Sequence, residues 1–136
     1  MKVLIDTNVL IDFLQQRESF ADAEQILSRC AQDQIQGFVA AHSIPNMFFI
    51  LRKFCSEEQR RNLLLFIVNL LQVVPIDSRK IEAALTNSKF KDFEDCLQDE
   101  CAAEINADFI ITRNIDDFAN SKIKPILPGD FLKTPL

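Results

Sequence analysis

Two short apolar runs in this chain each end in acidic or amide side chains. The first is Val3–Ile5, which leads directly into Asp6, and the second is Phe109–Thr112, which leads into a polar turn ending at Asp117. Runs this short and this apolar are typical of strands buried on both faces of a parallel sheet. Because ligands of such sheets bind beyond the carboxyl ends of the strands, both acids are placed for chemistry.

A third acidic group lies between these two runs. Asp92, Asp95 and Asp99 are spaced so that they share one face of a helix, while Cys96 and Leu97 face the core. Like charges at helical spacing destabilise a helix, so this stripe favours a bound cation. The alternative for Asp92 is a first-turn acid that complements the helix dipole.

Carboxylates that converge at one sheet edge repel each other, because neighbouring strands lie only ~5 Å apart. A shared proton, an arginine or a divalent metal resolves that repulsion, and hard oxygen ligands favour Mg2+ or Mn2+. The chain has one histidine and four scattered cysteines, with no Cys-x-x-Cys pair, which argues against zinc. As an alternative, Asp6, Asn114 and Asp117 are helix caps, although three caps gathered on one side are less economical.

Composition sets the class of protein. The chain has 136 residues, 48% of them hydrophobic, which suits a single domain over 1–136. The most apolar stretch, 63–71, is far shorter than the ~18 residues that cross a bilayer, and no secretory signal opens the chain, so we expect a cytoplasmic protein with no membrane. A net charge of −5 argues against a broad basic surface for nucleic acid, although a bound metal reverses the field locally.

Periodicity predicts alternating strands and helices. Strands are expected at 3–5, 38–41, 73–76, 109–112 and 124–127, with 73–76 at an edge because of its proline. Helices are expected at 10–14, 19–32, 44–54, 56–71, 78–85 and 92–106. This order predicts an α/β fold with a mainly parallel sheet. Neither the dinucleotide nor the P-loop glycine motif is present.

Three motifs together resemble the PIN domain family, in particular small bacterial proteins similar to VapC-type toxins. They are Asp6-Thr7-Asn8-Val9, the helix start Asp92-Phe93-Glu94-Asp95, and Thr112-Arg113-Asn114-x-x-Asp117-Phe118. The resemblance covers essentially the whole chain. It implies a three-layer α/β/α sandwich with a central, mainly parallel sheet, and an Mg2+- or Mn2+-dependent endoribonuclease. It also implies a homodimer and a small antitoxin partner.

The resemblance assigns roles to individual residues. Asp6 and Asp95 match two metal-binding acids, and either Asn114 or Asp117 matches a third, with Asp117 favoured because only it is ionised. Asn46 stands where the family has another carboxylate, so it removes one negative charge and weakens the site. We expect Asp6, Asp95 and Asp117 to hold one or two metals, with Asn46 or Asn114 completing the shell.

Other residues are expected to contact the substrate. Thr7 or Asn8 is placed to bond the carboxylates or the scissile phosphate, and Arg113 is the first choice for docking RNA. Further candidates for phosphate contacts are Arg52, Lys53, Arg60 and Arg61.

Two other functions stay open. A PIN-like domain that has lost catalysis and binds RNA or protein agrees with Asn46 and with the acidic composition. An acidic phosphotransfer protein is less favoured, since a phosphatase would carry Asp-x-Asp where this chain has Asp6-Thr7-Asn8. The hairpin at 43–71 is more apolar than one core face requires, which predicts an exposed patch for dimerisation or antitoxin binding.

Overall fold

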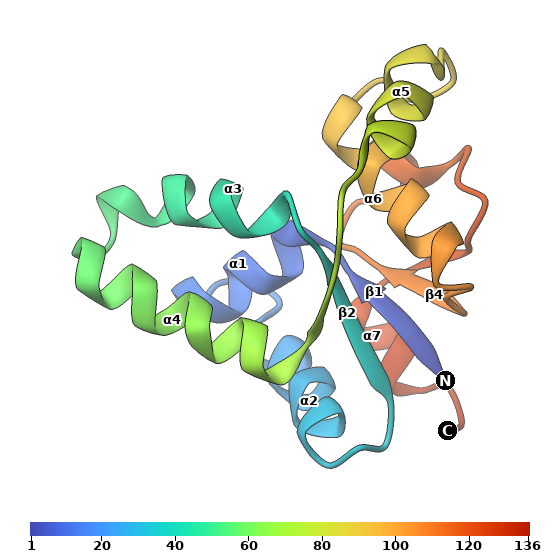
Figure 1. Ribbon diagram of the computed structural model, residues 1–136. Coiled ribbons are helices and arrows are strands. Elements are labelled where there is room, and N and C mark those ends of the chain that lie inside the picture. Colours follow the sequence, from blue (N-terminus) through green and yellow to red (C-terminus); the bar gives the residue numbers. More distant parts are fainter.

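The computed structural model describes all residues, 1–136, as a five-stranded sheet with helices on both faces (Figure 1). The strand order is β3-β2-β1-β4-β5, and every pair is parallel. The strands are β1 (Lys2–Ile5), β2 (Gln36–Ala40), β3 (Gln72–Val74), β4 (Phe109–Ile111) and β5 (Pro125–Ile126). The predicted fold class is confirmed, and β3 is the expected edge strand.

The helices form two layers around this sheet. They are α1 (Thr7–Gln15), α2 (Phe20–Ala31), α3 (Ser43–Ile50), α4 (Glu57–Leu70), α5 (Ser78–Thr86), α6 (Phe93–Glu104) and α7 (Pro128–Leu132). Short 3-10 turns occur at Leu51–Lys53 (η1) and Ile115–Phe118 (η2). Figure 1 shows α1, α2 and α4 on one side of the sheet and α5 and α6 on the other.

The central strand separates two hydrophobic clusters, because successive side chains of a strand point to opposite faces. Val3 and Ile5 belong to the larger cluster, with buried side chains of α1, α2, α3, α4 and α7. Leu4 belongs to the smaller cluster, with Ala102 of α6 and Phe118. Burial on both faces explains why β1 is continuously apolar, as the sequence predicted.

Most helix starts agree with the sequence. Ser56 forms a capping box with Gln59, and Asp77 and Asp92 each accept a backbone N–H at their helix starts. The largest differences from expectation are that α1 begins at Thr7, directly after β1, that α3 ends at Ile50, and that the short helix α7 was not expected. The early start of α1 leaves no loop after the strand, so Asp6 is fixed by regular structure on both sides.

The expected acidic stripe on α6 is partly wrong. Asp99 is fully buried and accepts hydrogen bonds from the Ser121 hydroxyl and from the Lys122 backbone N–H. Asp99 therefore anchors the segment after η2, and only Asp92 and Asp95 remain on the open side of the helix.

The four cysteines are free thiols, and three of them are buried. The helices are all too short or too polar to span a bilayer.

Gly37 marks the tightest packing in the sheet. A Cβ at this position of β2 would stand 2.5 Å from Cys30 Sγ and 2.7 Å from Leu71 Cδ2. We expect Gly37→Ala to lower the free energy of unfolding by about 1–3 kcal/mol, because the overpacked layer must shift. Urea unfolding measures this effect. The control is Gly129→Ala, whose Cβ would meet only Asp22 Oδ2, at 3.3 Å. Equal losses in the two variants would contradict the prediction.

Candidate active site

Asp6 lies at the carboxyl end of β1 with its side chain buried. It occupies the position before α1, yet its carboxylate makes no capping hydrogen bond, so it is not the simple helix cap that was the alternative. Its Oδ1 instead accepts a hydrogen bond of 2.8 Å from Gln98 Nε2, and its Oδ2 accepts one of 2.7 Å from Thr112 Oγ1. The carboxylate is therefore held between α6 and the end of β4.

Strand register brings these partners together. Ile5 is aligned with Ile111 across β1 and β4, so Asp6 and Thr112 are the next residues along two paired strands. Burial raises the pKa of the Asp6 carboxyl above its usual range, and the two hydrogen bonds partly offset that rise. Each carboxylate oxygen keeps a second lone pair for another donor or for a cation.

Asp95 is a second, partly buried acid whose pKa is raised. Its backbone N–H bonds to Asp92 Oδ1 at 2.9 Å, which confirms Asp92 as the helix cap. Burial, and then the charges of Asp6, Asp92 and Asp117, raise the pKa of the Asp95 carboxyl from 3.8 to about 7. The carboxylates are thus close enough to oppose each other's ionisation.

Asp117 lies in η2, on the opposite wall of a cleft of about 250 Å³ that Asp92, Asp95 and Asp116 also line. Asn114 lies outside this cleft, and its backbone N–H donates to Thr112 Oγ1 at 3.0 Å. Thr112 therefore connects the turn before η2 to Asp6. Asp117 lines the cleft with Asp95 and its charge acts on that carboxyl, whereas Asn114 lines only a neighbouring hollow that it shares with Asp116 and Asp117.

The start of α3 is tied to the same region. Thr7 Oγ1 donates to Ser43 Oγ at 2.7 Å, which joins the first turns of α1 and α3. Asn46 lies half-buried in the first turn of α3, and Asn8 Oδ1 is buried without a hydrogen-bond partner. His42 Nε2 lies 3.0 Å from the carbonyl oxygen of Glu94, so this nitrogen carries the proton.

These residues suit a divalent cation by type and by charge. The acids supply hard oxygen ligands, and Gln98 Oε1 is a further buried oxygen without a hydrogen-bond partner. The charges of the acids raise the pKa of Asp95, which a cation would reverse. No three acidic, histidine or cysteine side chains stand close enough together to enclose an ion by themselves.

Arg113, the expected docking residue, is engaged elsewhere. Its Nε lies 2.7 Å from Asp12 Oδ2, and its Nη1 lies 3.5 Å from Glu18 Oε2. Asp12 is almost fully buried in α1, so Arg113 neutralises a charge in the fold. The arginines of the hairpin are also occupied: Arg60 lies over Phe48 and Arg52 over Phe49, and Arg61 pairs with Glu57.

Sequence reasoning missed Gln98 and Thr112 as partners of Asp6. The signal for Gln98 was its place one helical turn after Asp95, on the same side of α6. Thr112 lies one residue after β4, as Asp6 lies one residue after β1. Equivalent positions after two neighbouring parallel strands predict a contact, but nothing local specifies a hydrogen bond.

A family model described as the PIN domain matches residues 2–116 of this sequence. The chain belongs to the PIN domain family. A search of curated proteins gives no significant match to this PIN domain.

Solved structures share the fold over nearly the whole chain. VapBC2 from Rickettsia felis, bound to a DNA fragment from their promoter, is similar with a TM-score of 0.70 at 15% identity, covering 93% of this chain and 98% of that one. A toxin–antitoxin complex from Klebsiella pneumoniae gives 0.68 at 22% identity, covering 93% and 97%. VapC20 from Mycobacterium tuberculosis, a toxin that cleaves the sarcin-ricin loop, gives 0.69 at 10% identity, covering 87% and 94%. This PIN domain therefore has the fold of the VapC toxins.

The raised pKa of Asp95 predicts how the stability of the metal-free PIN domain depends on pH. Between the ordinary value of 3.8 and about 7, folded Asp95 keeps a proton that the unfolded chain has lost. The free energy of unfolding should therefore fall as pH rises through this window. Urea unfolding at several pH values, with EDTA present, measures the fall.

Asp95→Asn should flatten that pH dependence, because the amide does not titrate. Mn2+ should oppose it, binding about tenfold more tightly at pH 8 than at pH 6, since the ion displaces one proton from a group of pKa near 7. A wild type and an Asp95→Asn variant with the same pH profile would contradict this assignment.

Proposed function

We propose that this PIN domain is an Mg2+- or Mn2+-dependent endoribonuclease, the toxin of a toxin–antitoxin pair. The observation that carries the proposal is the clustering of acids around Asp6, where burial and then the charges of the neighbouring acids raise the pKa of Asp95 to about 7. Groups with such perturbed pKa values, beside a cleft, mark functional sites. The cleavage of RNA by the structurally similar VapC20 supports the choice of substrate.

In this proposal Asp6, Asp95 and Asp117 hold the cation, and Asn46 or Asn114 completes its shell. Gln98 and Thr112 fix the orientation of the Asp6 carboxylate and leave each of its oxygens a lone pair for a cation. A divalent ion held by these residues would activate water at neutral pH and offset the charge on the leaving oxygen of a phosphodiester. Thr7 and Asn8, which directly follow Asp6 at the start of α1, would contact a phosphate bound there.

Mn2+ titration by calorimetry, with RNA cleavage followed on the same samples, tests the proposal. We expect wild type to bind Mn2+ and to cleave RNA, and Asp6→Asn to lose cleavage and at least tenfold in Mn2+ affinity. The control is Asp33→Asn, a surface aspartate in the turn before β2 with a positive φ of 57° that asparagine also adopts. This variant should behave as wild type.

Asn46→Asp decides between an active and a weakened enzyme. It restores one negative charge, so we expect tighter Mn2+ binding and faster cleavage. Metal binding by wild type with cleavage only in Asn46→Asp would identify a disabled nuclease that acts as a binding module. Binding of Mn2+ that does not depend on Asp6 would contradict the proposed site.

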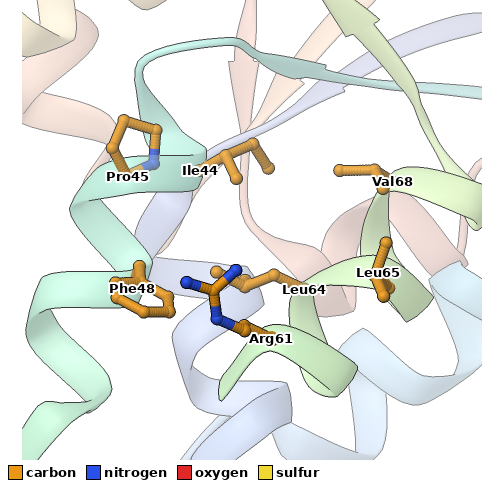
Figure 2. A pocket seen from close by; sticks show the side chains of 7 residues that line it. All are labelled: Ile44, Pro45, Phe48, Arg61, Leu64, Leu65 and Val68. Atoms are coloured by element: carbon orange, nitrogen blue, oxygen red, sulfur yellow. The ribbon is translucent and has the colours of Figure 1, made fainter. Parts of the chain in front are cut away.

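The α3–α4 hairpin is the surface we assign to a protein partner. Ile44, Phe48 and Leu64 line an open groove of about 510 Å³ with Arg61 at its rim (Figure 2). Leu65, which also lines the groove, and Phe49, Phe54 and Phe66 outside it are all more than 40% exposed. The exposed apolar patch predicted from the sequence is therefore present. The similarity to solved toxin–antitoxin complexes supports binding of an antitoxin in the groove. The exposed apolar side chains around the groove suit contact with a second copy of this chain.

Analytical ultracentrifugation at about 50 μM, in the micromolar range of modest protein interfaces, tests the homodimer. We expect wild type to sediment as a dimer and Leu65→Glu as a monomer, because a carboxylate in an apolar interface is left unpaired. Leu85→Glu is the control, since Leu85 is even more exposed than Leu65 but lies on α5, in the other layer. A monomeric wild type would contradict the dimer and leave the surface to the antitoxin.

A further inference from the structure

The acidic cleft has a basic wall that the sequence did not reveal. Lys89 and Lys91, in the loop between α5 and α6, line the same cleft of about 250 Å³ as Asp95 and Asp117. Phe90 and Asn120 complete this side of the cleft. Cations and metal-site acids therefore face one opening.

The positive charges of these two lysines are not paired with an acid. Neither makes an ion pair, whereas Lys80 pairs with Glu104, Lys122 with Glu100, and Arg113 with Asp12. Both lysine side chains are exposed, so each ammonium is available to an incoming anion.

The loop that carries the lysines is held by an internal hydrogen bond and by two contacts to the segment that follows Asp117. The backbone N–H of Lys89 donates to Asn87 Oδ1 at 2.9 Å, and its carbonyl accepts from Asn120 Nδ2 at 3.0 Å. The Phe90 ring packs edge-to-face on Phe118, with 6.4 Å between centroids. Phe118 follows Asp117 directly, so the position of the lysines is coupled to that of the acid.

Charge balance gives the lysines a role. Four aspartates and two lysines line the cleft, so its formal charge is −2 with all acids ionised, and one divalent cation brings it to zero. Without the cation the acids neutralise the lysines' field, and with it the lysines are free to attract an anion. A bound divalent cation therefore strengthens the attraction of the cleft for phosphate.

We propose that Lys89 and Lys91 bind RNA backbone phosphates next to the scissile phosphodiester, in the role that the sequence assigned to Arg113. This inference rests on the proposed ribonuclease function. Phosphate contacts of this kind fix the position and register of the strand without reading its sequence. Lys89 and Lys91 thus set where the strand lies relative to Asp95 and Asp117.

Fluorescence anisotropy with a labelled single-stranded RNA tests the lysines, in an Asp95→Asn background that prevents turnover and with Mn2+ at a concentration that saturates the weakened metal site. We expect the Lys89→Gln, Lys91→Gln double variant to bind about tenfold more weakly, and its logarithmic salt slope to fall by about 1.4, since each lost contact removes about 0.7. In each single variant the slope should decrease by roughly half of this amount. Lys133→Gln, a surface lysine after α7 and outside the cleft, should leave affinity and slope unchanged.

The outcomes separate this inference from the proposed function. If the double variant matches Lys133→Gln, the lysine role is wrong and the ribonuclease stands. If neither the Asp95→Asn parent nor wild type binds RNA, both the role of the lysines and the proposed ribonuclease function are wrong. Calorimetry of the double variant without Asp95→Asn should show Mn2+ affinity equal to wild type or higher. A loss of Mn2+ affinity would mean that the lysines support the cleft's shape, and would overturn the docking role.

Discussion

A buried carboxylate needs partners, and this constraint on Asp6 organises the centre of the molecule. An ionised side chain at the end of an interior strand is costly unless hydrogen bonds compensate for lost water. Gln98 from α6 and Thr112 after β4 supply them at 2.8 and 2.7 Å. The helix that carries Asp95 and the strand that leads to Asp117 are therefore tied to the same two oxygen atoms.

The acids that gather around Asp6 oppose the stability of the metal-free fold. Burial raises the pKa of both carboxyls, but hydrogen bonds partly offset the rise at Asp6, whereas the neighbouring acids add to the rise at Asp95, whose pKa reaches about 7. Natural proteins accept this kind of local conflict where function needs it. A bound cation would remove the repulsion that destabilises the metal-free state. The acids that lower the stability of the metal-free fold therefore also raise its affinity for metal.

The fold was predictable from local patterns, and the acids from their places at strand ends. Continuous apolar runs identified β1 and β4, and the motifs around Asp6 and Asp95 indicated the PIN family. Long-range pairs could not be read in this way. Arg113 was expected at the substrate, but buried Asp12, from a different element, binds its guanidinium. Such pairs depend on how elements pack, which periodicity leaves open.

Crystals soaked in Mn2+, with anomalous diffraction recorded at the manganese edge, test the central claim most directly. The account predicts a peak in the cleft within about 2.0–2.4 Å of oxygens from Asp6, Asp95 and Asp117, the range expected for a hard cation. A peak that leaves Asp6 without a metal contact, or manganese bound only at surface carboxylates elsewhere, would contradict it.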